Sequence, residues 1–188
     1  MQKKSIAILA WGSLLWEDNP QFHKHHHGWR KGGPVLKIEF SQIASPAEDG
    51  LALVIDGKHG AECRVAYTHS RRAHVEDAIC DLQSREETTR SNIGYILFER
   101  NECQGRDSDA VEEVRAWALR RRLRAVIWTD TPSNFEQSQQ RPFSVSAALN
   151  YIRSQSPRTK SKIAEYVWRS PEFVDTPLRR ALQKSPWF

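Results

Sequence analysis

The residues best suited to chemistry lie at the end of the first apolar run of the chain. Residues 7–10 (Ala-Ile-Leu-Ala) predict a buried strand, and Trp11, Gly12, Ser13 and Leu14 follow it directly. Glycine lets the backbone turn sharply and lets a ligand approach the neighbouring amides. Amides at the end of a central strand bind a carboxylate or a developing oxyanion. The sequence therefore predicts an anion-binding loop here, with an ordinary strand-to-turn junction as the alternative.

A second candidate is the carboxylate of Glu86, far downstream. Ile79 and Leu82 lie on the apolar face of a predicted helix, and Glu86 follows them at helical spacing. If the helix continues to Glu86, this carboxylate lies on the buried face, where desolvation disfavours its ionised form. Such a carboxylate is suited to exchanging protons near neutral pH. The alternative is a glutamate at a fraying helix end, paired with Arg85 or Arg90.

Histidines and cysteines offer weaker candidates. No cysteine pair at metal-ligand spacing accompanies the four histidines of a glycine-rich segment, so we expect an exposed loop at the cavity rim and no metal. The cysteines lack a nearby cysteine–histidine signature and are interpreted as small packing residues with reduced thiols. These residues are His23, His25, His26 and His27, and Cys63, Cys80 and Cys103.

The composition limits the class of protein. The chain has 188 residues, 39% hydrophobic and 27% charged, which is typical of one globular domain with a sizeable core. No apolar run has the length of a membrane span, and no signal-peptide cleavage site follows the N-terminus, so we expect a cytoplasmic protein with no membrane partner. The net charge is +5, and the densest basic cluster of the chain, residues 120–124, lies at the end of a predicted helix. Without a nucleic-acid motif we expect solvated basic faces and no nucleic-acid partner.

The elements that must position the candidate residues follow from periodicity and turn signals. The sequence predicts strands at residues 7–10, 35–40, 51–55, 61–68, 93–98 and 125–128, an irregular segment at 17–34, a turn at 45–50, and helices from about 71, at 108–118, 144–153, 160–169 and 177–183. Strands dominate the first part and helices the last, so the fold class is α+β. We expect a domain over residues 1–140 with a C-terminal helical extension, residues 141–188, packed on it.

Three short motifs and their order carry a resemblance to a known family. They are residues 11–14 (Trp-Gly-Ser-Leu) after the first strand, 85–86 (Arg-Glu) at the end of a helix, and 94–95 (Gly-Tyr) in the next strand. Over roughly residues 5–130 the chain resembles the gamma-glutamylcyclotransferase-like superfamily. That resemblance implies a small mixed or antiparallel barrel-like sheet with flanking helices.

The resemblance also implies an activity and a site. The substrate is a small gamma-glutamyl amine, held by Trp11 and by the backbone amides of Gly12, Ser13 and Leu14. Glu86 takes a proton from the substrate's α-amine, which attacks the γ-carbonyl and closes 5-oxoproline; Glu86 then protonates the departing amine. No metal or organic cofactor is implied. The alternative is a non-catalytic small-molecule-binding or regulatory module of the same fold, because Trp11 stands where the family's loop has a tyrosine.

Overall fold

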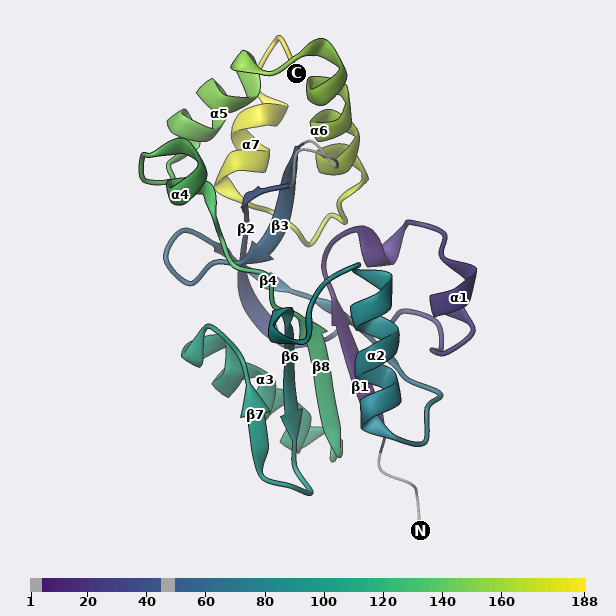
Figure 1. Ribbon diagram of the computed structural model, residues 1–188. Helices are drawn as coiled ribbons and strands as arrows, with labels where there is room; N and C mark the ends of the chain where they lie inside the picture. Colours follow the sequence, from purple (N-terminus) through teal and green to yellow (C-terminus); the bar gives the residue numbers. More distant parts are fainter. Residues whose placement is uncertain (1–4, 45–49) are drawn as a thin grey trace.

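The computed structural model describes residues 5–44 and 50–188, which form an α+β fold with two sheets and seven α-helices (Figure 1). The strands in this described part make two open sheets and no closed barrel. The turn predicted at 45–50 lies outside the described residues except for Gly50. None of the described helices has both the length and the apolar character that a membrane span requires.

The larger sheet is mixed and carries the N-terminal strand in its interior. Its order is β5-β1-β8-β6-β7, with β1 parallel to β8 and the other pairs antiparallel. The strands are β1 (Ile6–Ala10), β5 (Ala66–His69), β6 (Ile93–Leu97), β7 (Glu102–Gln104) and β8 (Ala125–Thr129). All five residues of β1 are buried, as its apolar run predicts, because helices cover both faces of the sheet.

Alternation along β1 separates two parts of the core. Ile6 and Ile8 pack with α2 (Val75–Arg85) in one apolar cluster. Ala7 and Leu9, on the opposite face, belong to the cluster that holds the apolar residues of α3 (Ser108–Arg120). The helix α2 therefore lies against the sheet on the face opposite α3, and its last residues reach the end of β1.

The smaller sheet is antiparallel, in the order β3-β2-β4, and consists of β2 (Val35–Ile43), β3 (Leu51–Ile55) and β4 (Ala61–Arg64). The single strand predicted at 61–68 is wrong, because the chain changes sheets at Val65. The Val65 N–H donates to Pro34 O, and Val65 O accepts from Gly33 N. These two hydrogen bonds to the preceding loop separate β4 from β5, and the chain passes from one sheet to the other at Val65.

Four helices follow the sheets and gather at one end of the molecule, over β2 and β3 (Figure 1). They are α4 (Phe135–Gln139), α5 (Val145–Ser154), α6 (Pro157–Arg169) and α7 (Pro177–Gln183). Side chains of Ser144, Ser156 and Thr176 cap α5, α6 and α7 by accepting from an amide three residues on. The division of the chain at residue 140 stays a prediction.

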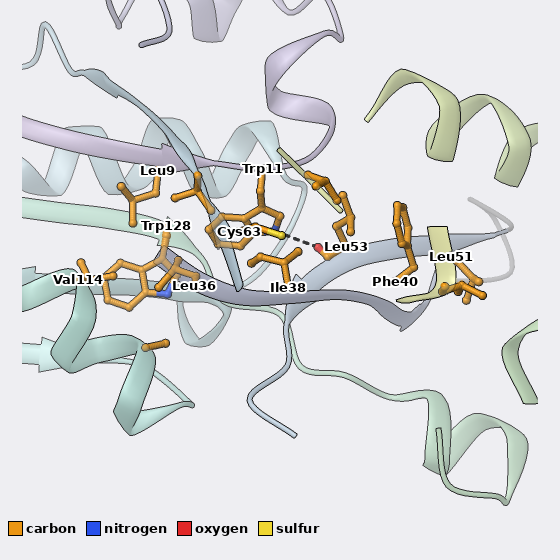
Figure 2. Close-up of a cluster of buried hydrophobic side chains, with 14 of the residues drawn as sticks. Leu9, Trp11, Leu36, Ile38, Phe40, Leu51, Leu53, Cys63, Val114 and Trp128 are labelled. Atoms are coloured by element: carbon orange, nitrogen blue, oxygen red, sulfur yellow. Dashed lines mark hydrogen bonds between the residues drawn. The ribbon is translucent and has the colours of Figure 1, made fainter. Parts of the chain in front are cut away.

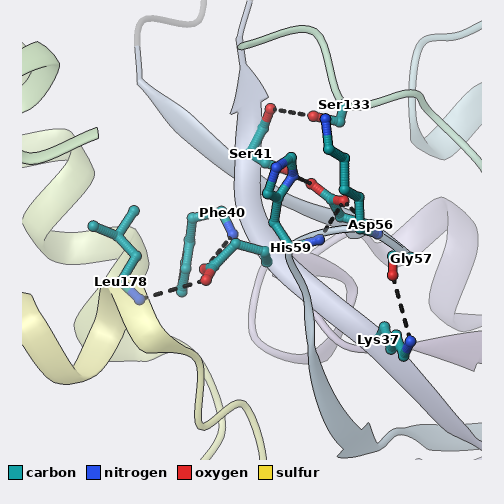
Figure 3. A network of polar contacts seen from close by, with 10 residues as sticks. Lys37, Phe40, Ser41, Asp56, Gly57, His59, Ser133 and Leu178 are labelled. Carbon is teal, nitrogen blue, oxygen red and sulfur yellow. Dashed lines mark hydrogen bonds and ion pairs between the residues drawn. The ribbon is translucent and has the colours of Figure 1, made fainter. Parts of the chain in front are cut away.

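Polar contacts of β2 hold the C-terminal part in place (Figure 3). Leu178 N–H, at the start of α7, donates to Glu39 Oε2 at 3.4 Å, and Ser133 Oγ donates to Ser41 O at 2.9 Å. Burial raises the pKa of Glu39, while hydrogen bonds with Thr176 and with the amides of Phe40 and Leu178 oppose that rise. A fully buried carboxyl thus joins the central strand of this sheet to the last helix.

Local contacts also move the start of α2. Helical periodicity predicts a start near Arg71, whereas α2 begins at Val75. The Arg71 N–H donates to His25 O, and the Arg72 N–H donates to Ser70 Oγ. Since both amides are bonded to the loop before the helix, the helix begins only after them. The segment at 17–34, predicted to be irregular, contains the short helix α1 (Pro20–His23).

Candidate functional site

The turn after β1 is built as predicted, from a strand end, a glycine and a short helical turn. The chain leaves β1 and forms the 3₁₀ turn η1 (Ser13–Leu15), in which Leu15 N–H donates to Gly12 O at 3.0 Å. The first amides of such a turn have no acceptor within it. Leu14 is buried in the cluster under α2 and anchors the turn. These amides are therefore held at the end of a buried strand.

Trp11 connects this turn to the smaller sheet. The side chain is 5% exposed, and its Nε1 donates to Leu53 O in β3 at 3.2 Å (Figure 2). Leu53 lies in an edge strand, opposite an irregularity in the pairing of β2 with β3. The indole thus satisfies a carbonyl that the sheet does not pair, and it ties the end of β1 to β3.

Glu86 lies at the end of α2 rather than within it. The helix ends at Arg85, Glu86 is the C-cap residue with φ −89° and ψ 1°, and Glu87 has a positive φ of 47°. Of the two alternatives, a helix that continues to Glu86 and a glutamate at the helix end beside Arg85, the structure has the second. The side chain of Glu86 is nevertheless only 19% exposed, with Oε1 3.7 Å from Arg85 Nη1. Arg85 Nη2 also donates to Glu17 Oε2 at 2.8 Å, so one guanidinium serves both acids.

A cavity of about 1060 Å³ brings the candidate residues together. Its lining includes residues 11–14, Glu86 with its neighbours at 85–88, residues 50–53 at the start of β3, and one face of α6. The cavity is therefore lined by all five residues that the sequence singled out: Trp11, Gly12, Ser13, Leu14 and Glu86. Glu86 lies 72 positions after Leu14 in the chain. Their individual roles stay predictions.

Tyr166, on the cavity face of α6, is a lining residue that the sequence pattern does not single out. A Cβ placed on Gly12 would lie 2.7 Å from the Tyr166 hydroxyl oxygen, so this phenol packs directly against the turn. Burial raises the pKa of Tyr166 above its usual value; the carboxylates of Glu86 and Glu17 add to the rise, and hydrogen bonds from the backbone of Leu53 and Ser13 oppose it. The apolar stripe of α6 indicates that this helix docks, but it does not indicate which turn the helix docks against.

Two charged side chains of α6 that line the cavity pair with each other, and one of them also bonds to the backbone after the turn at residues 13–15. Arg169 Nη1 lies 3.1 Å from Glu165 Oε1, and Arg169 Nη2 donates to Trp16 O at 3.4 Å. Exposed pairs of this kind contribute about 0–1 kcal/mol each. This part of the lining therefore carries charges of both signs, and its ion pair contributes little to stability. The buried contacts of Trp11 and Tyr166 hold the adjoining part of the cavity lining.

The histidine segment, predicted to be an exposed loop, is exposed at His27 but buries His26. His26 is 5% exposed and packs against the rings of Phe22 and Trp29, with centroid distances of 4.8 Å and 5.1 Å. Its Nε2 lies 3.1 Å from His23 Nδ1. Over residues 5–44 and 50–188, no group of three metal-ligating side chains is arranged to hold a metal ion. None of the four histidines is among the residues that line the cavity.

The cysteines divide into one buried residue and two exposed ones. Cys63 is buried in the apolar cluster, as predicted, whereas Cys80 and Cys103 are exposed, and packing is the wrong interpretation for them. Burial raises the pKa of the Cys63 thiol, which disfavours the thiolate that a nucleophile needs. Cys63 is therefore poorly suited to act as a nucleophile.

Comparison of the chain with protein-family models, with curated proteins and with solved structures gave no match. The function must therefore be inferred from the cavity and the residues that line it.

Proposed function

We propose that this chain is a gamma-glutamylcyclotransferase-like enzyme that converts a gamma-glutamyl amine into 5-oxoproline and a free amine. The observation that supports this proposal is the shared cavity of about 1060 Å³, in which the turn at Gly12 and Ser13 and the half-buried carboxylate of Glu86 are both part of the lining. A cavity of this size accommodates a gamma-glutamyl group together with a sizeable amine.

Glu86 carries both proton transfers of the proposed reaction. It accepts a proton from the α-amine as the nitrogen attacks the γ-carbonyl carbon, and it returns that proton to the amine nitrogen as the amide bond breaks. One carboxylate is sufficient because the proton taken in the first step is the proton given in the second. Arg85, at 3.7 Å, and the helix end restrict the orientation of the carboxylate.

The backbone of the turn orients the substrate in this proposal. The amides of Gly12 and Leu14 bind the glutamyl group and help to stabilise the oxyanion that forms on the γ-carbonyl. Ser13 belongs to the same turn, whose free space beside Gly12 is already occupied by the Tyr166 hydroxyl. The gamma-glutamylcyclotransferase-like fold itself belongs to this proposal, beyond the α+β class described above.

A second candidate function is a non-catalytic binding module. It is favoured by one observation, the Tyr166 hydroxyl that already contacts the turn at Gly12 and Ser13. Such a module would bind a gamma-glutamyl compound and release it unchanged.

The experiment that separates the two is a mass-spectrometric screen of gamma-glutamyl dipeptides and gamma-glutamyl polyamines with wild type and Glu86→Gln. We expect at least one conjugate to yield 5-oxoproline, and Glu86→Gln to lower that rate about 10²–10⁴-fold while binding is retained. Glu113→Gln, an exposed position on α3, is the matched control and should react as wild type does.

The proposal fails if no conjugate yields 5-oxoproline, or if Glu86→Gln reacts as fast as wild type. A conjugate that binds and is recovered intact supports the binding module instead.

A further inference from the structure

The helix α6 presents one face to the cavity, although it lies outside the residues on which the family resemblance depends. Lys162, Tyr166 and Arg169 follow one another at intervals of four and three, which places them on a single helix face, and all three line the cavity. Tyr166 lies in the middle of this face. Its ring packs edge-on against Trp16, with a centroid distance of 5.2 Å, and against Phe40 at 6.2 Å.

The hydroxyl of Tyr166 lies where three segments of the chain meet. The oxygen packs against Gly12, where the missing Cβ leaves room for it, and the backbones of Ser13 and Leu53 lie close enough to oppose the rise of its pKa. The carbonyl oxygen of Leu53 also accepts a hydrogen bond from the indole N–H of Trp11. The two aromatic side chains that contact the turn after β1 thus both lie beside Leu53, an edge-strand residue.

We propose that Tyr166 is a positioning residue of the site: its hydroxyl holds the turn at Gly12 and Ser13 against β3, so the cavity keeps its shape only while α6 is docked. The amides of the turn and the carboxylate of Glu86 come from different elements, and nothing in β1 or α2 alone sets the distance between them. The contact with Leu53 fixes the turn relative to β3, and the aromatic contacts fix Tyr166 relative to the rest of the core. This inference rests on the proposed function only where it concerns turnover.

A double-mutant cycle in thermal unfolding tests the contact itself. Gly12 has a φ of −121°, so alanine there introduces no left-handed strain, and its Cβ would meet the Tyr166 oxygen at 2.7 Å. We expect Gly12→Ala to lower Tm by about 4–8 °C in the wild-type background. In Tyr166→Phe the oxygen is gone and the next ring atom lies 3.8 Å away, an ordinary contact, so the same substitution should lower Tm by less than half as much.

Tyr151→Phe is the matched background for this cycle, because Tyr151 lies on the neighbouring helix α5 and is not among the cavity-lining residues. There Gly12→Ala should cause the full decrease in Tm. An equal decrease in the Tyr166→Phe and Tyr151→Phe backgrounds would overturn the inference, since the hydroxyl would then not lie against the turn.

Kinetics with the conjugate found in the screen test the positioning role. A displacement of a reacting group by about 1 Å lowers rates about 10²-fold, so we expect Tyr166→Phe to lower kcat about 10–100-fold and to change KM less than about 3-fold. Tyr151→Phe should leave both constants near the wild-type values. Unchanged kcat and KM in a folded Tyr166→Phe enzyme would overturn the inference. A wild type that processes no conjugate contradicts the proposed function instead, and the Tm cycle then decides the inference alone.

Discussion

At the residue scale, the wall of the cavity depends on two aromatic side chains, Trp11 and Tyr166, that both lie beside Leu53. Trp11 donates its indole N–H to Leu53 O, and the backbone of the same residue opposes the rise in the pKa of the Tyr166 hydroxyl. Phenylalanine would fill much of the same space in either position without a polar atom. The polar atoms of these rings are therefore the features to test one at a time.

Trp11→Phe should destabilise the protein measurably. The substitution leaves Leu53 O without the indole donor, and an unsatisfied buried carbonyl costs about 1–3 kcal/mol. The measurement is the free energy of unfolding in urea. Trp168→Phe, which changes an indole that is 49% exposed on α6, should change that free energy by less than about 0.5 kcal/mol. Equal effects of the two substitutions would show that the bond to Leu53 is unimportant.

The stability of the protein should fall in mild acid because of His26. Burial lowers its pKa below the ordinary value of 6.5, and the charges of His23, Arg71 and His27 lower it further. Below about pH 6.5 the unfolded chain binds a proton that the folded chain does not, so unfolding takes up a proton and acid favours it. This stability is complete above about pH 6.5 and is lost as the pH decreases toward the folded pKa.

Urea unfolding between pH 7.5 and pH 5 measures this effect. His26→Gln should reduce the slope of stability against pH, by at most about 1.4 kcal/mol per pH unit. Part of the slope should remain, because burial also lowers the pKa of His69. The exposed His74 provides the control, His74→Gln, which should retain the wild-type slope. An unaltered slope in His26→Gln would contradict this origin of the acid sensitivity.

At the scale of elements, the docking of α7 depends on a buried guanidinium as well as on apolar contacts. Arg179 is 8% exposed and donates to the backbone carbonyls of Ser170, Pro171 and Val174 in the connection between α6 and α7. Charged donors make stronger bonds than neutral ones. This single side chain thus shapes the connection that leads from the cavity helix α6 to the last helix.

Arg179→Met should therefore cost about 2–4 kcal/mol of folding free energy, since three carbonyls lose a charged donor. The neighbouring Arg180 is 54% exposed and lies 3.6 Å from Asp175, so Arg180→Met should cost about 0–1 kcal/mol. Unfolding in urea measures both. Similar values for the two variants would show that the burial of Arg179 contributes nothing to the docking of α7.

At the scale of the whole molecule, one apolar cluster runs through both parts of the chain. Phe40 and Leu53 from the smaller sheet share it with Ile163, Val167 and Leu178 from the C-terminal helices. Burial of each such side chain contributes about 1.5–3 kcal/mol. The last helices therefore complete the core of the smaller sheet, and α6 supplies a wall of the cavity at the same time.

A fragment of residues 1–140 tests how independent the first part is. Removal of α5, α6 and α7 exposes the apolar face of β2 and β3, so we expect the fragment to lose cooperative thermal unfolding and to aggregate. Circular dichroism melting of the fragment and of the full chain measures this. A fragment that melts cooperatively within about 5 °C of the full chain would show that residues 1–140 fold as a domain by themselves.

The sequence by itself determined the local elements and the residues that could do chemistry. Apolar periodicity placed β1 and α3 nearly at their observed bounds, and it separated a strand-rich first part from a helical last part. The loop at residues 11–14 and the carboxylate of Glu86 stood out by residue type and position. These properties depend on neighbours within a few positions, and the chain itself carries that information.

The tertiary structure alone decided what depends on segments far apart in the chain. Bonds to the loop at Gly33 and Pro34 divide the predicted strand at Val65, and ring contacts bury His26 in a segment that reads as exposed. The docking of α6 brings Tyr166 against a turn some 150 positions earlier. No periodicity encodes such a pairing, because it is the packing of helices on a sheet that determines which side chain reaches which backbone.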